Sequence, residues 1–240
     1  MRKGGTETLT SAQKIFADLH QLFPGRALML IEGLRATNRE QGKFPKWREE
    51  QIAKLGIMVV QSALDLERAY SERRITALAW ATRNLLELSV WIDYCNLSDN
   101  HAKLFSDDSL RDLYGLSEAV QRTVEMELGQ KDTDLDRGLS ELAHFAQALG
   151  IQALKDDFKA VSAAAKELGR LQKFQAANKL LSKFAHPTSW AVHIADTPGP
   201  IAGYLTMILQ DGAFLAMNAI IAIRKTIRSE YPEIARSKGD

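Results

Sequence analysis

One helical stretch, residues 77–97, carries side chains whose types and spacing could support chemistry. At about 100° per residue, its polar and aromatic side chains share one face: Trp80, Arg83, Asn84, Glu87, Trp91 and Tyr94. The opposite face is aliphatic: Leu78, Leu85, Leu88 and Ile92. An arginine and a carboxylate four residues apart can pair. One interpretation is a solvated ion pair beside tryptophans that cover neighbouring helices. The other is a partly buried polar site, because so many aromatic rings seldom lie on a solvated face.

A second polar stripe lies just before Pro187 and contains Gln175, Lys179, Ser182, Lys183 and His186. We expect His186 to end a helix, where the helix dipole favours a protonated imidazole. One alternative is that His186 only caps the last carbonyl groups of that helix. The other is a general acid or base, or a phosphate ligand, acting together with Lys183.

An acidic side chain, Asp211, interrupts the apolar stretch of residues 201–223. A carboxylate at a bilayer centre costs about 2.5–3.5 kcal/mol, so we expect a helix of the protein core and no membrane span. A carboxylate in apolar surroundings usually has a partner. We therefore expect Arg83 to pair with Asp211 or with Glu87 at the centre of the bundle.

No metal and no cofactor is expected. His193 lies seven residues beyond His186, but a metal site would also need Glu87 or Asp211 to converge on the two imidazoles. No two of these ligands have a dedicated spacing on one helix. The sequence also has no phosphate-binding loop, no dinucleotide fingerprint and no His-Glu-x-x-His motif.

Helical periodicity runs through the whole chain and predicts an all-α fold, a multi-helix bundle of long packed helices. Without a convincing linker, the simplest division is one domain spanning residues 1–240. Glycine, proline and N-cap residues delimit the expected helices. These are residues 11–22, a second one through 34, 46–70, 77–97, 106–128, 134–149, 151–168, 170–186 and a last long one ending before 232.

The composition of the chain indicates which partners and which cellular compartment to expect. The chain has 31 basic and 30 acidic side chains, for a formal charge of +1, whereas proteins that bind nucleic acid mainly through phosphates tend to be more basic. The single cysteine, Cys95, excludes an internal disulfide and a cysteine-based zinc site, and fits a reducing interior. No apolar run follows the basic residues at the start, so no signal peptide is expected. We expect a cytoplasmic protein.

Two short runs are similar to a known group of proteins: Ala-Thr-Arg-Asn-Leu-Leu-Glu at 81–87 and Leu-Leu-Ser-Lys-Phe-Ala-His-Pro-Thr at 180–188. They resemble a broad family of uncharacterised bacterial all-helical proteins that pair an Arg-x-x-x-Glu helix with a Ser-x-x-x-His-Pro segment. That family is in turn similar to HEPN helical bundles. These occur in toxin–antitoxin and phage-defence systems and include metal-independent ribonucleases.

The spacing of the HEPN ribonucleases is absent. They carry an arginine and a histidine a few residues apart near one helix end. At that distance before His186 stand Lys179, Leu180 and Leu181, and at that distance after Arg83 stand Leu88, Ser89 and Val90. The same chemistry would need Arg83 and His186 to meet from two separate helices.

Two functions follow from these observations. The first is a protein-binding or oligomerising module, which the resemblance places in a bacterial defence or stress system. The second is a HEPN-like metal-independent ribonuclease or nucleotide-binding enzyme that uses His186 with Arg83 and Glu87. Its binding residues would be Trp80, Asn84, Trp91, Lys183 and Asp211, with the tryptophans stacking on bases. Convergence of Arg83, Glu87 and His186 on one cleft favours the enzyme, and dispersal favours the module.

Overall fold

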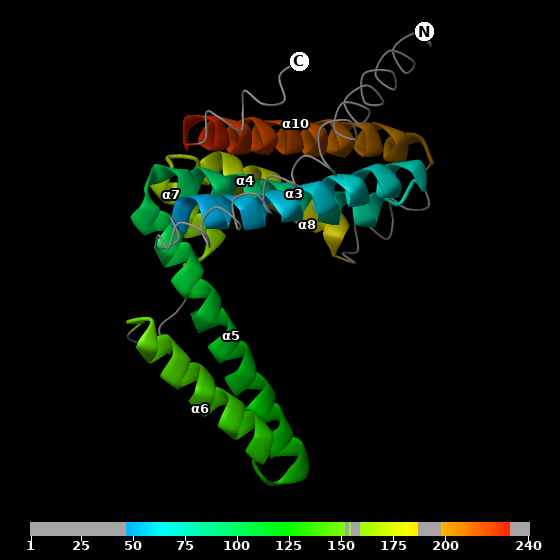
Figure 1. Cartoon of the computed structure of the whole chain (residues 1–240). Coiled ribbons are helices and arrows are strands. Elements are labelled where there is room, and N and C mark those ends of the chain that lie inside the picture. Colours follow the sequence, from blue (N-terminus) through cyan, green and yellow to red (C-terminus); the bar gives the residue numbers. More distant parts are fainter. Residues whose placement is uncertain (1–46, 152–153, 155–158, 187–197, 231–240) are drawn as a thin grey trace, which may run out of the picture.

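A bundle of long helices with a projecting helical hairpin makes up the described part of the chain (Figure 1). The computed structural model describes residues 47–151, 154, 159–186 and 198–230, with side chains of the last stretch for 203–226. Within these residues every regular element is an α-helix, as predicted. The helices are α3 (Trp47–Ser71), α4 (Ile75–Leu97), α5 (Asp99–Leu128), α6 (Thr133–Ala148), α7 (Val161–Glu167), α8 (Leu171–Ala185) and α10 (Pro198–Glu230). The predicted helices within residues 11–34, and His193, lie outside the described residues.

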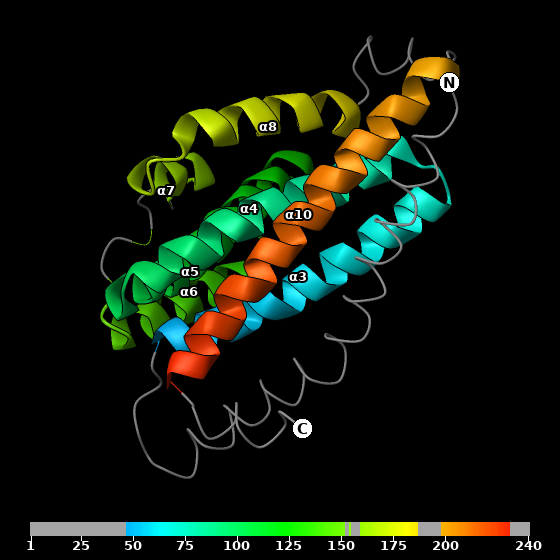
Figure 2. The same ribbon diagram turned by 90° about the horizontal axis from the view of Figure 1, so that it is seen from above.

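Helix α4 lies at the centre of the body and contacts α3, α5, α7, α8 and α10. Seen from above, α10 crosses over the α3–α4 pair, and α8 flanks α4 on the side away from α3 (Figure 2). The side chains predicted for the aliphatic face of α4 are all buried: Leu78, Leu85, Leu88 and Ile92. Burial of such side chains is the main favourable term in folding, so this face determines how α4 is oriented in the bundle.

A glycine allows α10 to approach its neighbours closely. A Cβ atom on Gly212 would lie 2.7 Å from Leu66 Cδ1 of α3 and 2.7 Å from Thr82 Oγ1 of α4. The Thr82 hydroxyl also donates a hydrogen bond of 3.2 Å to the carbonyl of Ile208, one turn before Gly212. Three helices therefore meet at a point where no other side chain fits.

Helix α10 also contains one stretch, Gly203–Thr226, that is long and apolar enough to cross a membrane by length and composition alone. Of this stretch 44% is buried in the structure. Its buried apolar side chains belong to the core cluster that includes α3 and α4: Leu205, Ile208, Leu209, Ala216, Ala219, Ile220 and Ile223. The stretch thus forms part of the packed body.

The predicted start of α5 is wrong. The expected N-terminus at residues 106–109 lies inside a helix that begins at Asp99, seven residues earlier. Ser98 has an extended backbone and caps α5, because its Oγ accepts a hydrogen bond of 3.3 Å from the backbone N–H of His101. One long helix therefore runs from the body into the hairpin with α6, which we call the arm (Figure 1).

The predicted helix of residues 151–168 is confirmed for Val161–Glu167, whereas the described residues before it, Ile151, Leu154, Lys159 and Ala160, are not helical. In the structure α7 begins only at Val161, after Ala160 in extended conformation. The backbone N–H of Lys159 donates to Asp108 Oδ2 of α5 at 3.1 Å. It therefore bonds to a side chain of another helix and not to a carbonyl of a preceding helical turn. The terminators were predicted correctly, since Gly150 and Gly169 have φ values of 74° and 68°.

Gly212→Ala should destabilise the protein. Alanine is intrinsically better than glycine in a helix by about 1 kcal/mol, but overpacking a core typically costs about 1–3 kcal/mol. Since the clashing atoms lie on two helices, we expect a net loss of unfolding free energy in denaturant titrations. Gly203→Ala on the same helix is the matched control, because nothing lies within 4 Å of its Cβ position. It should be neutral or stabilising, and equal effects of the two substitutions would contradict the close approach.

The single thiol should be unreactive in the native protein. Cys95 is fully buried in α4, and this burial raises its pKa to about 12. Because the thiolate is the reactive form, a disulfide reagent at mildly alkaline pH should label Cys95 only after unfolding. Rapid labelling of the folded chain would show that the α4 core opens far more often than this packing implies.

Candidate functional site

Arg83, Glu87 and His186 lie together on the surface of the body. Arg83 Nε donates to Glu87 Oε1 at 3.1 Å, and Arg83 Nη1 lies 3.4 Å from His186 Nε2. The two partners of Arg83 come from different helices, since Glu87 is one turn further along α4 and His186 is the C-cap of α8. Because a guanidinium can only donate, the contact requires His186 Nε2 to be the acceptor. We call Trp80, Arg83, Glu87 and His186 the Arg–His site.

Trp80 fixes the geometry of this site. Its indole Nε1 donates to the carbonyl of Ala185 at 2.9 Å, which ties the end of α8 to α4. The indole ring meets the imidazole of His186 edge to face at 5.9 Å and 75°. The guanidinium carbon of Arg83 lies 5.8 Å from the same ring, within the range of cation–π attraction. One aromatic side chain therefore positions both candidate catalytic groups.

The site is open to solvent on one side and continues into a pocket. Trp80 and His186 are exposed, and the Arg83 and Glu87 side chains are 24% and 32% exposed. Trp80 also lines a pocket of about 800 Å³ between the facing ends of α3 and α4, as does Asn84. Two arginines at its rim share one acid, since Arg68 and Arg74 lie 3.0 and 3.3 Å from the Glu72 carboxylate. The predicted binding residues Trp80 and Asn84 thus face one open hollow, whose charged lining is two arginines and two acids, Asp65 and Glu72.

The other predicted site residues lie outside the Arg–His site or make other contacts. Trp91 packs on Tyr94 and on Phe105 of α5, with ring centroids 5.8 and 4.8 Å apart. Tyr94, placed on the polar face by the helical pattern, is only 1% exposed. Lys183 is exposed on α8, one turn before His186. The polar face of α4 is therefore divided between the Arg–His site and an aromatic contact with α5.

Asp211 does not pair with Arg83, so that version of the predicted ion pair is wrong. Arg83 does pair with Glu87, but at the partly exposed surface of the body and not at the centre of the bundle as expected. Asp211 instead lines a second pocket, of about 670 Å³, between α4, α8 and α10. Among the described residues it has no ion-pair partner. The surrounding apolar groups, including Phe214, desolvate the carboxylate and raise the pKa of Asp211, although one side remains open to water.

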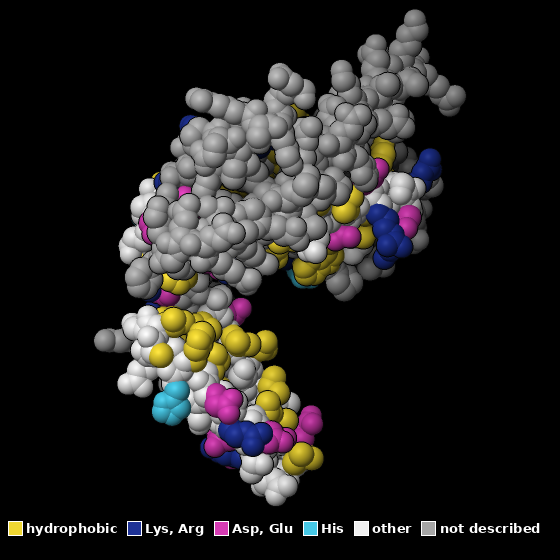
Figure 3. Space-filling model, in the orientation of Figure 1, with side chains coloured by type: hydrophobic (Ala, Val, Ile, Leu, Met, Phe, Trp, Pro, Cys, Tyr) yellow, Lys and Arg dark blue, Asp and Glu magenta, His cyan; other side chains and the backbone are white. Residues whose placement is uncertain are grey.

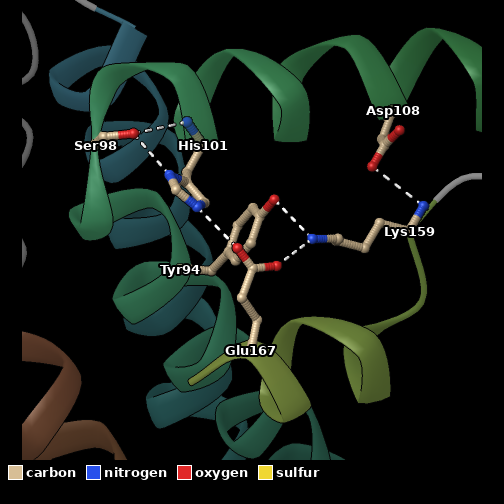
Figure 4. Close-up of polar contacts among 6 residues, drawn as sticks. All are labelled: Tyr94, Ser98, His101, Asp108, Lys159 and Glu167. Atoms are coloured by element: carbon tan, nitrogen blue, oxygen red, sulfur yellow. Dashed lines mark hydrogen bonds and ion pairs between the residues drawn. The ribbon is translucent and has the colours of Figure 1, made fainter. Parts of the chain in front are cut away.

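A polar network at the root of the arm was not predicted from the sequence (Figure 4). His101 Nε2 lies 2.9 Å from Glu167 Oε1, and the other carboxylate oxygen accepts from Lys159 Nζ at 2.5 Å. Lys159 Nζ also donates to the phenol of Tyr94 at 2.9 Å. Since a carboxylate only accepts, Nε2 of His101 carries a proton, and its Nδ1 lies 2.6 Å from the Ser98 hydroxyl.

This network joins four parts of the chain, including α4, which provides Tyr94. Helix α5 provides His101, α7 provides Glu167, and Lys159 precedes α7. Hydrogen bonds from Lys159 and His101 lower the pKa of Glu167, outweighing the partial desolvation of its carboxylate. Burial lowers the pKa of Lys159, but its bonds to Glu167 and Tyr94 outweigh this and the net shift is upward. Nothing in the spacing of these residues could have revealed the network, because they meet only through the packing of α7 on α4.

Within the described residues no group of three His, Cys, Asp or Glu side chains could hold a metal ion. In the Arg–His site only two side chains, Glu87 and His186, could be metal ligands, and Glu87 already pairs with Arg83. A guanidinium held beside an imidazole can instead bind an anion and accept or donate a proton. The arrangement suits chemistry on a phosphate group.

Glu167→Gln should destabilise the protein in a pH-dependent way. Because the folded pKa of Glu167 lies below its ordinary value of 4.5, its contacts stabilise the protein above that value and lose this contribution as the pH falls through the folded pKa. We expect the difference in unfolding free energy between the wild type and Glu167→Gln to be present at neutral pH and to vanish in acid. Glu141→Gln, an exposed change of equal charge on α6, is the control. A difference that stays constant with pH would show that the charge of Glu167 does not matter.

Comparison with known proteins gives no further assignment. No protein-family model, no curated protein and no solved structure matches this chain. The resemblance of its two short runs to bacterial HEPN-like proteins therefore stays a prediction, and the case for a function rests on the geometry of the Arg–His site.

Proposed function

We propose that this protein is a metal-independent ribonuclease that uses His186 with Arg83. One observation carries the proposal: a guanidinium and an imidazole from positions 103 residues apart lie 3.4 Å from each other on an open surface. The two-helix arrangement replaces the single-helix spacing of HEPN ribonucleases, which this chain lacks. Arg83, Glu87 and His186 do converge, although on an open surface beside a pocket that Trp80 lines and not inside a cleft.

In the proposed reaction, a phosphodiester of single-stranded RNA displaces the long contact between Arg83 and His186. The N–H groups of Arg83 bind the non-bridging phosphate oxygens. His186 Nε2 takes the proton of the ribose 2′-hydroxyl, and the 2′-oxygen forms a bond to phosphorus. The bond from phosphorus to the 5′-oxygen breaks, and that oxygen takes a proton from water. The products are a 2′,3′-cyclic phosphate and a 5′-hydroxyl end.

The remaining residues of the site have defined roles in this scheme. Glu87 holds the guanidinium by its Nε, which leaves the Nη1 edge directed at His186. A fixed positive charge that meets the developing charge on phosphate is the largest usual term in such catalysis. Trp80 acts as a positioning residue for Arg83 and His186, and its exposed ring offers a stacking surface for a base.

The neighbouring pocket supports a nucleotide substrate. It is lined by Trp80 and Asn84, and by Arg68 and Arg74, which a phosphate would have to draw away from their shared partner Glu72; Asp65 lines it too. An amide can hydrogen-bond the edge of a base, and arginines can contact the next phosphate along the strand. RNA would be available to this protein in the cytoplasm, where we propose that it acts.

The test is cleavage of labelled single-stranded RNA by the purified full-length protein in the presence of a chelator. Loss of a general base typically lowers the rate by about 10²–10⁴-fold, so His186→Ala should be that much slower than wild type. Arg83→Met should be impaired to a similar degree, about 10²-fold or more. His144→Ala, which removes an exposed histidine of the arm, is the matched control and should keep full activity.

The substrate gives a second, independent criterion. RNA with a 2′-deoxy or 2′-O-methyl group at the scissile nucleotide should resist cleavage, and the products should carry cyclic phosphate ends. Wild-type protein that leaves RNA intact, or His186→Ala that cleaves as fast as wild type, would refute the proposal. Because His186 is exposed at the end of α8, its substitution should leave the unfolding transition unchanged.

A further inference from the structure

The arm has almost no core of its own. Beyond the first turns of α5, the buried residues of its two helices are Asp107 and Gln121 on α5 and Ala146 on α6. Figure 1 shows the hairpin projecting from the body, so among the described residues its outer part packs only helix against helix. Two helices alone bury little apolar surface, and most helical stability in proteins comes from tertiary packing. Such a hairpin is suited to receive another element.

One side of the arm presents exposed large apolar side chains, which we call the arm face: Leu113, Leu116, Val120, Phe145 and Leu149. Apolar side chains are visible along the arm in Figure 3. The three on α5 follow a three- and four-residue spacing, so they lie within about 60° of each other around the helix. Phe145 of α6 and Leu149, the C-cap residue of that helix, are four residues apart and lie within about 40°.

Helix geometry places both sets on the same side of the hairpin. The buried residues Gln121 of α5 and Ala146 of α6 mark the inner side of each helix. Around the axis of its own helix, each apolar set lies roughly 60–140° from that inner side, and the direction of rotation along the chain is the same for both helices. In an antiparallel hairpin, turns of the same sense on the two helices point to one common side. The arm face is therefore a continuous strip that follows the groove between α5 and α6.

The size of the strip suits a single helix. The exposed fractions of its residues run from 43% for Val120 to 61% for Leu116. At roughly 180 Å² for a complete large side chain, they expose roughly 450 Å² of apolar surface, and patches of about 300–600 Å² on monomers are often functional. A third helix laid in the groove between two antiparallel helices completes a bundle with ordinary ridge-and-groove packing.

The charges beside the strip are mostly negative. Asp112, Glu127 and Glu141 are exposed and lie within about 60° of the arm face around their helices. Asp134 lies in that arc as well, and the nearest basic side chain, Arg137, about 80° from Phe145, is paired with it at 2.9 Å. Residues 110–150 as a whole have eight acidic and four basic side chains, although the chain as a whole has a charge of +1. Like charges would oppose the pairing of two arms, whereas a basic partner would be attracted.

We infer that the arm face binds a basic amphipathic helix of another protein. The leucines and the phenylalanine would receive the apolar side of that helix, and the flanking carboxylates would meet its lysines and arginines. This mode is helix-in-groove recognition, with anchors at three- and four-residue spacing. The inference is independent of RNA cleavage at the Arg–His site, because it depends on different residues on a different part of the molecule.

The probe is a synthetic helical peptide of leucine and lysine, with the leucines on one face, titrated against the full-length protein by fluorescence anisotropy. Saturable binding that weakens with added salt is expected. A peptide of the same composition in scrambled order, and one with glutamate in place of lysine, should each bind at least tenfold more weakly.

Variants locate the binding. Leu116→Asp should weaken binding of the leucine–lysine peptide at least tenfold, and Glu127→Lys with Glu141→Lys should weaken it to a similar degree at low salt. Leu64→Asp, which changes an exposed leucine of α3 (41% exposed), is the matched control and should bind as wild type does. Helicity by circular dichroism and protection of the Cys95 thiol establish that each variant is folded.

Three outcomes would overturn the inference. Equal binding of the scrambled or glutamate peptide would mean that the spacing of the apolar residues and the charge of the arm face do not determine binding. Undiminished binding to Leu116→Asp would place the peptide elsewhere. Sedimentation of the wild type as a dimer that Leu116→Asp dissociates would show that a second copy of this chain covers the arm face.

Discussion

The burial of one face of α4 is the constraint on which the rest of the structure depends. Leu78, Leu85, Leu88 and Ile92 must leave water, and α3, α8 and α10 together enclose them. Once that face is inside, helical periodicity turns the opposite face of α4 outward. Gly212 then allows α10 to lie close enough to α3 and α4 for the enclosure to be complete. The polar residues of α4 are thus positioned by the apolar ones.

The Arg–His site shows how such a core supports chemistry at its edge. The residues next to Arg83 and Glu87 on α4, including Thr82 and Leu88, are buried, so the backbone that carries the two side chains is held by the core. His186 follows the last turn of α8, and the bond from Trp80 to the Ala185 carbonyl holds that turn against α4. A pair of long charged side chains would normally lose much rotamer freedom on ordering. Here the ion pair and the tryptophan ring restrict the guanidinium before any ligand arrives, and this preorganisation is what phosphate chemistry requires.

Much of the fold could be predicted from the sequence, because the periodicity of α4 and the breaks at Gly150, Gly169 and Pro187 depend only on neighbouring residues. The Arg83–Glu87 pair was predicted for the same reason. The start of α5 was missed, since four polar residues at 106–109 outweighed the true cap at Ser98. The network around Glu167 and the meeting of Arg83 with His186 depend on which helices pack together. That information lies in the whole core and in no local spacing.

Helix α5 connects body and arm as one uninterrupted rod. Its 30 residues extend about 45 Å at 1.5 Å per residue. The root is clamped, because Ser98 caps it and His101 is bonded to Glu167 of α7, while the far end carries only α6. The arm is in mechanical terms a cantilever, and a sideways load at its tip acts with greatest leverage on the clamp. From there α7 leads directly into α8, whose last turn carries His186. Because α5 is one stiff helix, a force on the tip of the arm is transmitted through α7 and α8 to the edge of the Arg–His site.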